Sequence, residues 1–541
     1  MPLLYKLART NLPCHRHLTI AQLSMNVYFK IPAKQNNFIY KRWPTITIQM
    51  MMLIAYAQVG PPATVQVWVG LFGTANPPQL TMDAGGEGQL TVLSPLRSIR
   101  DSITDAAGQA LNHRAILQLT GLQPGTSYLV TVRAGAETRS ITTSTLPAAL
   151  PQKLDDTFNI LLCSCYSQPE DASGLMGSVV SQIMLRPHMT MMLGDQIYGD
   201  LPIFEDLPAA AAGVAQKLGE KYLRNWASTQ LETGGLGRVF SRAPVVCVAD
   251  DHEFWNNYPF AQTQLPKTWT APGRAQWKAA AQGLYEDYQL AGAAGGAQRI
   301  DIDPLKMLVV DMRSLRDEKF TNLMPPATVA EIVKWEADLL ADRAVNKPAF
   351  GLLASGQALF VTPTQESKRE RQDAEMSNYA QFGTLLVPTL ERLSAAGIPV
   401  IYVTGDVHWS RVAQARDVRS ERLMVYEVIA SPSRLIRIPA LDAAKEALAD
   451  LKGIFGKAKK PWPRHGDAEK VPKRLGESGR FRLECDLETK WGFARQGDHV
   501  AVMSFCKAGA GIDFNVTYYA VTDDKALGKS ETTRTYELRN I

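Results

Sequence analysis

The sequence predicts a layered α/β domain preceded by a smaller all-β domain. Short, nearly continuous apolar runs rich in β-branched residues are typical of strands buried on both faces of a sheet. The segment TVAEIVKWEADLLADR has the apolar periodicity of a helix and lies between two of these runs, as expected where strands and helices alternate. From about Thr64 to Leu146 the runs instead alternate between apolar and polar residues and are separated by Gly, Pro, Asn and Asp, which predicts a β-sandwich.

The composition of the 541 residues is that of a globular protein long enough for more than one domain. The net charge is +5, but Lys and Arg form no stripe with interleaved aromatic residues, so we find no nucleic-acid-binding footprint. One dense basic stretch, near residues 453–475, also carries Pro and Gly. We interpret it as an exposed insertion, with a polyanion-binding patch as the alternative.

Six cysteines in a chain of this length do not form a disulfide scaffold. Cys163, Cys165 and Cys247 fall in predicted buried strands, where Cys usually packs as a small apolar residue. Cys485 and Cys506 belong to a strand-rich tail that we expect to complete or cap the sheet. They could pair in an oxidising compartment, and their spacing leaves this open.

Near the N-terminus, Lys41 and Arg42 precede the apolar run TITIQMMMLIAYA, which ends in Ala55-Tyr56-Ala57. This order of charge, apolar core and small residues is typical of a secretory signal, so we expect a periplasmic or secreted protein, with a disordered leader as the alternative. The predicted domains are a leader over residues 1–57, a β-sandwich over 58–150 and the α/β domain over 151–541. No segment predicts a transmembrane span, which needs about 20 apolar residues.

Six apolar runs each end in residues able to bind metal or act on phosphate. They are FNILLCSC ending at Cys165, HMTMMLGDQIY at Asp195 and Tyr198, APVVCVADDHEFWNNY at Asp250 to Asn257, PLKMLVVDMRSLR at Asp311 to Arg316, GIPVIYVTGDVHWS at Asp406 and His408, and RLMVYEVIASPS at Ser431. Ligands of open α/β sheets collect outside the carboxyl ends of the strands. The six runs therefore predict one shared site.

The clusters differ in how strongly they indicate chemistry. The string from Asp250 to Asn257 combines two Asp, a His, a Glu and two amides, a set that is costly to desolvate unless cations balance its charge. Asp406 and His408 are two apart in an extended segment and so point to the same side. Arg313 suits a bidentate grip on a tetrahedral oxyanion, with an ion pair to Asp311 or Asp317 as the alternative.

Five of these strings, Ser164-Cys165, GDQIY, DDHEFWNN, DMRSLR and GDVHWS, stand in the order found in the PhoD-type alkaline phosphatase and phosphodiesterase family. Over about Phe158 to Ser433 the chain resembles that family, which has the metallophosphatase (calcineurin-like) superfold of mixed sheets flanked by helices. Upstream, LTGLQPGTSYLVTVRAG resembles the end of a fibronectin type III or immunoglobulin-like module, with Tyr128 placed for a tyrosine corner. A sandwich before the catalytic domain is also expected in the PhoD-type family.

The resemblance implies a centre that contains Fe³⁺ and Ca²⁺. Carried over, the iron ligands are Cys165, Asp195, Tyr198 and Asp406, while Asp195 bridges to calcium held by Asp251, Asn257 and His408. Thiolate, phenolate and carboxylate stabilise a trivalent ion, whereas carboxylate and amide oxygens suit calcium, so His408 is the least expected ligand. Asn256 is the alternative to Asn257. Tyr166 departs from the family, in which Gln often follows the Cys.

The resemblance also implies a hydrolase of a small-molecule or polymer phosphate ester. In the predicted mechanism a metal-bound hydroxide attacks phosphorus, Arg313 neutralises the equatorial oxygens, and His252 or His408 protonates the leaving group. One alternative is a phosphodiesterase, phospholipase D-like, that acts on cell-wall, nucleotide or lipid diesters. Another is a non-catalytic binding protein on the same scaffold.

Overall fold

The structure is a computed structural model that describes residues 51–152, 156–202, 207–227, 234–292, 295–370, 375–408, 410–435, 473–484, 493–495, 497–522 and 527–540. The first fifty residues of the predicted leader, most of the basic insertion and Cys485 lie outside the described residues. Cys163, Cys165, Cys247 and Cys506 are buried and form no disulfide within the described part of the chain.

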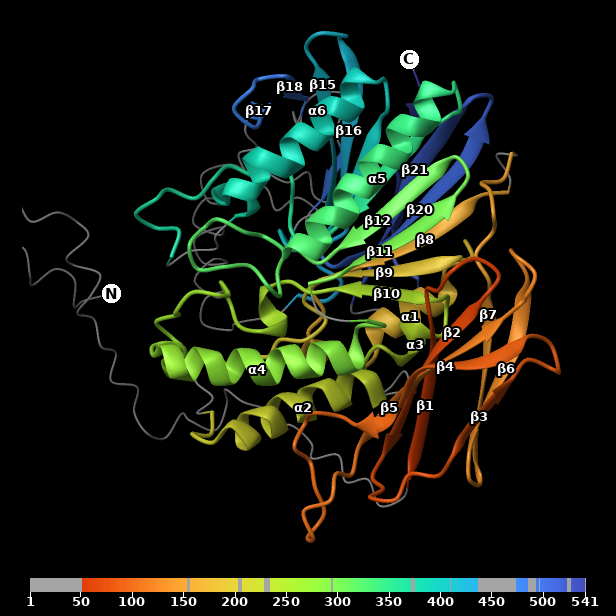
Figure 1. The fold of residues 1–541 in the computed structure, drawn as a ribbon, viewed down its shortest axis with the longest axis vertical. Coiled ribbons are helices and arrows are strands. Elements are labelled where there is room, and N and C mark those ends of the chain that lie inside the picture. Colours follow the sequence, from red (N-terminus) through yellow and green to blue (C-terminus); the bar gives the residue numbers. More distant parts are fainter. Residues whose placement is uncertain are drawn as a thin grey trace, which may run out of the picture. The chain divides into compact units, whose positions relative to one another are not determined.

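Two large mixed sheets form the centre of the fold (Figure 1). The first has the order β22 (Ser530–Thr532), β21 (Gly511–Ala520), β20 (His499–Ala508), β8 (Phe158–Cys163), β9 (Met189–Leu193), β10 (Val245–Val248), β1 (Met52–Gln58), β2 (Val65–Phe72), β5 (His113–Thr120) and β4 (Gln89–Ser98), with β23 (Tyr536–Leu538) paired to β21. The second has the order β11 (Ala297–Ile302), β12 (Leu305–Val310), β13 (Phe350–Ala354), β14 (Val400–Thr404), β16 (Arg422–Ile429), β15 (Ser410–Asp417), β18 (Phe481–Glu484) and β17 (Arg474–Leu475), with β19 (Phe493–Arg495) paired to β15. The strand-rich tail thus adds strands to both sheets, β20 to β23 to the first and β18 and β19 to the second.

Helices cover the outer faces of both sheets, and an apolar layer fills the space between them (Figure 1). Helices α1 (Leu175–Gln182), α2 (Ala211–Ala227), α3 (Gly237–Phe240) and α4 (Ala271–Tyr288) pack on the first sheet, and α5 (Pro326–Ala344) and α6 (Val387–Ala395) on the second. In β8, Leu161 and Cys163 face the helices, whereas Ile160 and Leu162 face the other sheet. Burial on both faces explains the continuous apolar runs, and the layered α/β prediction is confirmed.

Parallel pairing brings the carboxyl ends of the central strands to common edges. Strands β8, β9 and β10 are parallel neighbours in the first sheet, and β12, β13, β14 and β16 are parallel neighbours in the second. Strand β13, with the sequence FGLLA, was not among the six predicted runs because no chemically distinctive residues follow it.

The region before the α/β part consists of strands only. Strands β1, β2, β5 and β4 face a small sheet of β3 (Leu80–Asp83), β6 (Ser127–Ala134) and β7 (Glu137–Ser144) across their own apolar core. The Tyr128 hydroxyl accepts a hydrogen bond from the Gln123 N–H at 2.9 Å, as a tyrosine corner requires. Assignment of this region to a fibronectin type III or immunoglobulin-like class stays a prediction.

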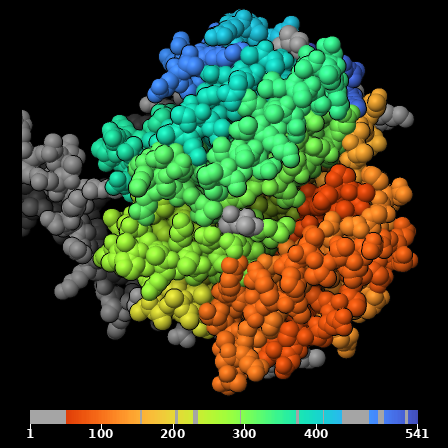
Figure 2. All heavy atoms as spheres, in the orientation of Figure 1, coloured from red at the N-terminus to blue at the C-terminus, as the bar shows by residue number. Residues whose placement is uncertain are grey.

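The predicted boundary at residue 57 lies inside a strand, whereas residue 150 lies between β7 and β8. Residues Met52–Gln58 form β1, which pairs with β2 along its whole length and meets β10 at Gln58 and Val245. Cleavage after Ala57 would remove most of this buried strand from the sheet, so residues Met52–Gln58 are part of the fold. The strand region and the α/β part form one compact unit (Figure 2).

Among the described residues, no helix is both long and apolar enough to cross a membrane.

Ion pairs link the strand region to α4. Asp287, whose side chain is fully buried, accepts hydrogen bonds from Arg97, Arg100 and Arg114. Burial raises the pKa of Asp287, but the hydrogen bonds and charges of Arg100 and Arg97 outweigh it and bring the pKa below its ordinary value. The carboxylate is therefore more favourable in the folded chain than in the unfolded one.

We expect Asp287→Asn to lower the free energy of unfolding by about 3 kcal/mol at pH 7, because it leaves buried Arg114 without its counter-charge. The loss should begin to shrink as the pH falls below about 4, where the carboxylate of the unfolded chain becomes protonated, and it should vanish only below the lowered pKa of the folded chain. Urea unfolding at pH 7 and pH 3.5 measures both effects. Asp83→Asn, at the exposed ion pair with Arg133, is the control and should change the free energy of unfolding little. Equal losses of stability in the two variants would contradict a stabilising role for the ion pairs between Asp287 and the strand region.

Candidate metal centre

The carboxyl ends of four strands, three in the first sheet and one in the second, bring most of the predicted ligands together. The potential ligand atoms of three overlapping groups each lie within 4.8 Å of one another. The groups are Cys165, Asp195 and His408; Asp195, Asp251 and His252; and Asp195, Asp250, Asp251 and Asp406. These residues follow β8, β9, β10 and β14. Asp195 belongs to all three groups and is therefore the central residue of the cluster.

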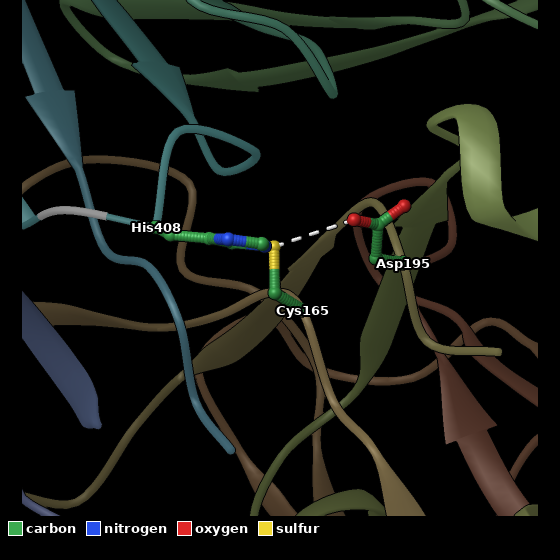
Figure 3. Close-up of side chains that lie close together, drawn as sticks. All are labelled: Cys165, Asp195 and His408. Atoms are coloured by element: carbon green, nitrogen blue, oxygen red, sulfur yellow. Dashed lines mark hydrogen bonds between the residues drawn. The ribbon is translucent and has the colours of Figure 1, made fainter. Parts of the chain in front are cut away.

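Figure 3 shows Cys165, Asp195 and His408, with the His408 ring extending toward the sulfur. The Cys165 thiol donates to Asp195 Oδ2 at 3.4 Å, and the Ser431 hydroxyl donates to the sulfur at 3.3 Å. Cys165 and Asp195 are buried, whereas His408 is exposed. The thiol therefore forms the inner wall of the cluster, and His408 lies at its outer side.

The backbone at the cluster adopts a conformation that L-residues rarely use. Ten described non-glycine residues have φ in the left-handed region, and five of them are predicted ligands. Those five are Cys165, Asp195, Asn257, Asp406 and His408. Each such residue costs on the order of 1–3 kcal/mol and persists only where surrounding contacts enforce it. Enforced strain at so many potential ligands indicates a functional site.

Two glycines allow the strand-end loops to approach closely. A Cβ at Gly405 would lie 2.4 Å from both the Leu193 carbonyl oxygen and the Ser164 Cβ. Gly194 has φ of +89°, and a Cβ there would lie 2.6 Å from that of Asp250. Glycine before each Asp thus lets the loops after β8, β9, β10 and β14 touch.

Glu253 is a residue whose role the sequence did not reveal. Its buried carboxylate accepts the backbone N–H groups of Asp195 at 2.9 Å, Gln196 at 2.7 Å and Asp250 at 2.8 Å. It belongs to the DDHEFWNN string, in which the sequence distinguishes it only as an acidic residue. Its actual function is to join the loop after β9 to the loop after β10.

The cluster is electrostatically costly. Burial, then the neighbouring Asp251 charge, raises the pKa of Asp195 to about 7, against the opposing effect of His252. Burial and the charge of Asp195 raise the pKa of the Cys165 thiol well above its ordinary value. Several anionic groups that disfavour one another in a buried space are stabilised by bound cations.

Tyr198 provides a further test of whether the residues fit a metal ion. Its hydroxyl is buried and has no hydrogen-bond partner among the described residues, and its ring centroid lies 4.4 Å from that of His252. Burial and the nearby Cys165 raise the pKa of this phenol well above its ordinary value. A buried phenol oxygen without a partner among the described residues, beside thiol and carboxyl groups, fits a bound metal ion.

Arg313 lies against the acidic residues rather than in open space. Its Nε is 3.4 Å from Asp250 Oδ1, its Nη2 is 3.3 Å from Asp251 Oδ2, and its side chain is 1% exposed. Asp311, the partner expected in the ion-pair alternative, instead accepts the Arg313 backbone N–H at 3.0 Å. The guanidinium therefore balances part of the cluster's negative charge, and a grip on phosphate stays a prediction.

His252 is oriented by Asp200, which the sequence reading missed. The His252 Nδ1 lies 2.8 Å from Asp200 Oδ1, and Asp200 Oδ2 accepts the Asn256 N–H at 2.9 Å. The only signal was a second Gly-Asp pair directly after GDQIY. Asn257, in contrast, is buried and donates its N–H to Asp251 Oδ2 at 2.6 Å. The structure thus places Asn257 beside the cluster and the Asn256 backbone beside Asp200.

We expect Gly405→Ala to lower both thermal stability and metal content, because its methyl group would overlap the Leu193 carbonyl and separate the loops. Differential scanning calorimetry and elemental analysis measure the two effects. Gly383→Ala is the matched control, since a Cβ there meets nothing within 4 Å. If the two substitutions had the same effect, the close packing of the loops would not matter for the centre.

Comparison with known proteins places the fold. No family model and no curated protein matches this chain. A solved structure described as the structure of PhoD is similar over 90% of this chain and 92% of its own, with a TM-score of 0.54 and 14% sequence identity. A second solved structure is described as GAP50, the anchor in the inner membrane complex of Plasmodium. It matches over 71% of this chain and 89% of its own with 10% identity, and its TM-score of 0.33 is too low to establish a shared fold. At these identities the chain is shown to share the fold of PhoD over nearly its whole length.

Proposed function

We propose that this chain is a metal-dependent hydrolase of phosphate esters. The observation that carries the proposal is the convergence of thiol, carboxyl and imidazole groups at the strand ends of the two sheets, with four of these residues on backbone in the left-handed region. Groups of this kind, brought within 4.8 Å of one another, are suited to hold cations. The fold shared with PhoD supports a phosphate ester as the substrate.

The donor types suggest how two kinds of cation would be divided. The anionic set suits Fe³⁺, and the carboxylate and amide set suits Ca²⁺, with Asp195 between them. The first set is Cys165, Asp195, Tyr198 and Asp406, and the second includes Asp251 and Asn257. His408, which the family resemblance implies as a calcium ligand, is an imidazole that lies with Cys165 and Asp195. Bound there, cations supply Lewis acidity that activates water and neutralises phosphoryl oxygens.

The chain's own groups would orient the substrate and move a proton. Arg313 lies against Asp250 and Asp251. From there its guanidinium would partly neutralise the negative charge of a phosphoryl oxygen. His252, oriented by Asp200, is the best-placed proton donor for a leaving alkoxide. His408 is the alternative donor, because it lies at the exposed side of the cluster.

Asp195→Asn should abolish metal retention and lower phosphate-ester hydrolysis by at least ~10³-fold, since the central ligand loses its charge. The measurements are elemental analysis of the purified protein and turnover of p-nitrophenyl phosphate and bis-p-nitrophenyl phosphate. The two substrates distinguish a monoesterase from a diesterase. Asp338→Asn is the control, because the Asp338 side chain is exposed on α5, away from the cluster ligands. Full metal content and activity in Asp195→Asn would refute the assignment, and a metal-free, inactive wild type would favour a binding protein.

Asp200→Asn should leave metal content unchanged and lower kcat by about 10²-fold, because His252 loses the carboxylate that orients it. Steady-state kinetics beside metal analysis provides the measurement. Loss of metal together with activity would show that Asp200 supports the ligands instead of the proton donor.

A further inference from the structure

A cavity of about 460 Å³ lies against the chain that follows the DDHEFWNN string and is not used by the chemistry described so far. Phe260, Gln262, Thr263, Trp269, Arg274 and Glu318 are among the residues that line it. This volume falls within the range of small-molecule sites, roughly 300–1,000 Å³. The cavity is thus large enough for part of a substrate.

The chain connects the cavity directly to the metal centre. The Phe260 N–H donates to the Asn257 carbonyl at 3.1 Å and closes a turn, which keeps the two Cα atoms within about 7 Å. Asn257 in turn contacts Asp251. A group bound against Phe260 is therefore near enough to belong to the same substrate as a phosphate at the metal centre.

Trp269 presents a rigid aromatic surface in this cavity. Its side chain is 59% exposed, yet its Nε1–H donates to the Gln262 carbonyl at 2.8 Å, which fixes the ring. The loop is held further because the Thr268 hydroxyl accepts the Gln262 N–H at 2.8 Å. An exposed indole held in one orientation is a stacking platform for a flat ring.

Gln262 adds a directional polar group. The residue is 7% exposed and lines the cavity, and its Nε2 has no hydrogen-bond partner among the described residues. A buried amide donor without a partner costs free energy, and an acceptor atom on a ligand would recover it. The cavity therefore offers a stacking surface, and a residue with an unpartnered amide nitrogen lies in its wall.

The charges of the cavity indicate what it does not bind. Arg274 and Glu318 pair through two contacts of 3.2 and 3.3 Å, so neither presents an uncompensated charge to a ligand. Glu370 contributes a negative charge to the lining, which disfavours a second phosphate. An uncharged ring with a hydrogen-bond acceptor satisfies all of these constraints.

We propose that this cavity is the leaving-group subsite and that it takes a planar heteroaromatic ring of the nucleobase type. The ring stacks on Trp269 and accepts a hydrogen bond from Gln262 Nε2. The proposal rests on the hydrolase function proposed above and makes a nucleoside phosphate ester the preferred substrate class.

Binding of adenosine, measured by calorimetry on the full chain, tests the subsite without turnover. Wild type should bind adenosine, with ribose as a silent control, and Trp269→Ala should weaken binding about 5- to 150-fold. Trp269→Phe should retain most of the affinity, and Gln262→Leu should lose part of it. Unchanged adenosine affinity in Trp269→Ala would overturn the proposal. So would Trp269-dependent binding of tetramethylammonium in place of adenosine, which would indicate a site for organic cations.

Kinetics separates failure of the subsite from failure of the function. The ratio of kcat/KM for 5′-adenosine monophosphate to that for glycerol phosphate should fall at least fivefold in Trp269→Ala. Hydrolysis of both esters with an unchanged ratio would overturn the subsite alone. Hydrolysis of neither ester by wild type, with adenosine still bound through Trp269, would refute the proposed function and, with it, the leaving-group role.

Discussion

The carboxylate of Glu253 is the constraint on which the candidate metal centre depends. It accepts backbone N–H groups from Asp195, Gln196 and Asp250, so one side chain sets both the loop after β9 and the loop after β10. Burial and the charge of Asp195 raise the pKa of Glu253 to about 8, which shows that its anionic form is costly at this place. The three hydrogen bonds secure the geometry of residues that must converge, because N–H groups that share one carboxylate cannot move independently.

Other parts of the metal centre are also locally unfavourable and are held in place by the surrounding fold. Left-handed backbone at five predicted ligands, two glycines at close contacts and several buried acidic groups all oppose folding locally. The two sheets, with an apolar layer between them and helices outside, are the rigid scaffold that tolerates this. A bound cation would relieve the repulsion and so couple metal binding to the stability of the strand-end loops.

Motifs that carry their chemistry in adjacent residues were readable from the sequence. DDHEFWNN and GDVH each place several donors on one loop, and the strands before them are recognisable because burial on both faces demands continuous apolar runs. Partners far apart in sequence were not readable: Asp200 orients His252, and Arg313 meets Asp250 and Asp251 instead of Asp311. The run ending at Ala57 misled because a buried strand and the apolar part of a signal peptide have the same short apolar composition.

By itself, the sequence determined the layered α/β class and the set of residues at the strand ends, since periodicity and local composition are properties of neighbouring residues. The structure decided which of these residues meet. Parallel pairing of β8, β9 and β10 placed Cys165, Asp195 and Asp251 at one edge, and the apposed second sheet added Asp406 and His408 from β14. It also decided that Trp269 and Gln262 line one cavity with Arg274 and Glu318. Such contacts depend on sheet order and on the close approach of backbones, which local patterns do not encode.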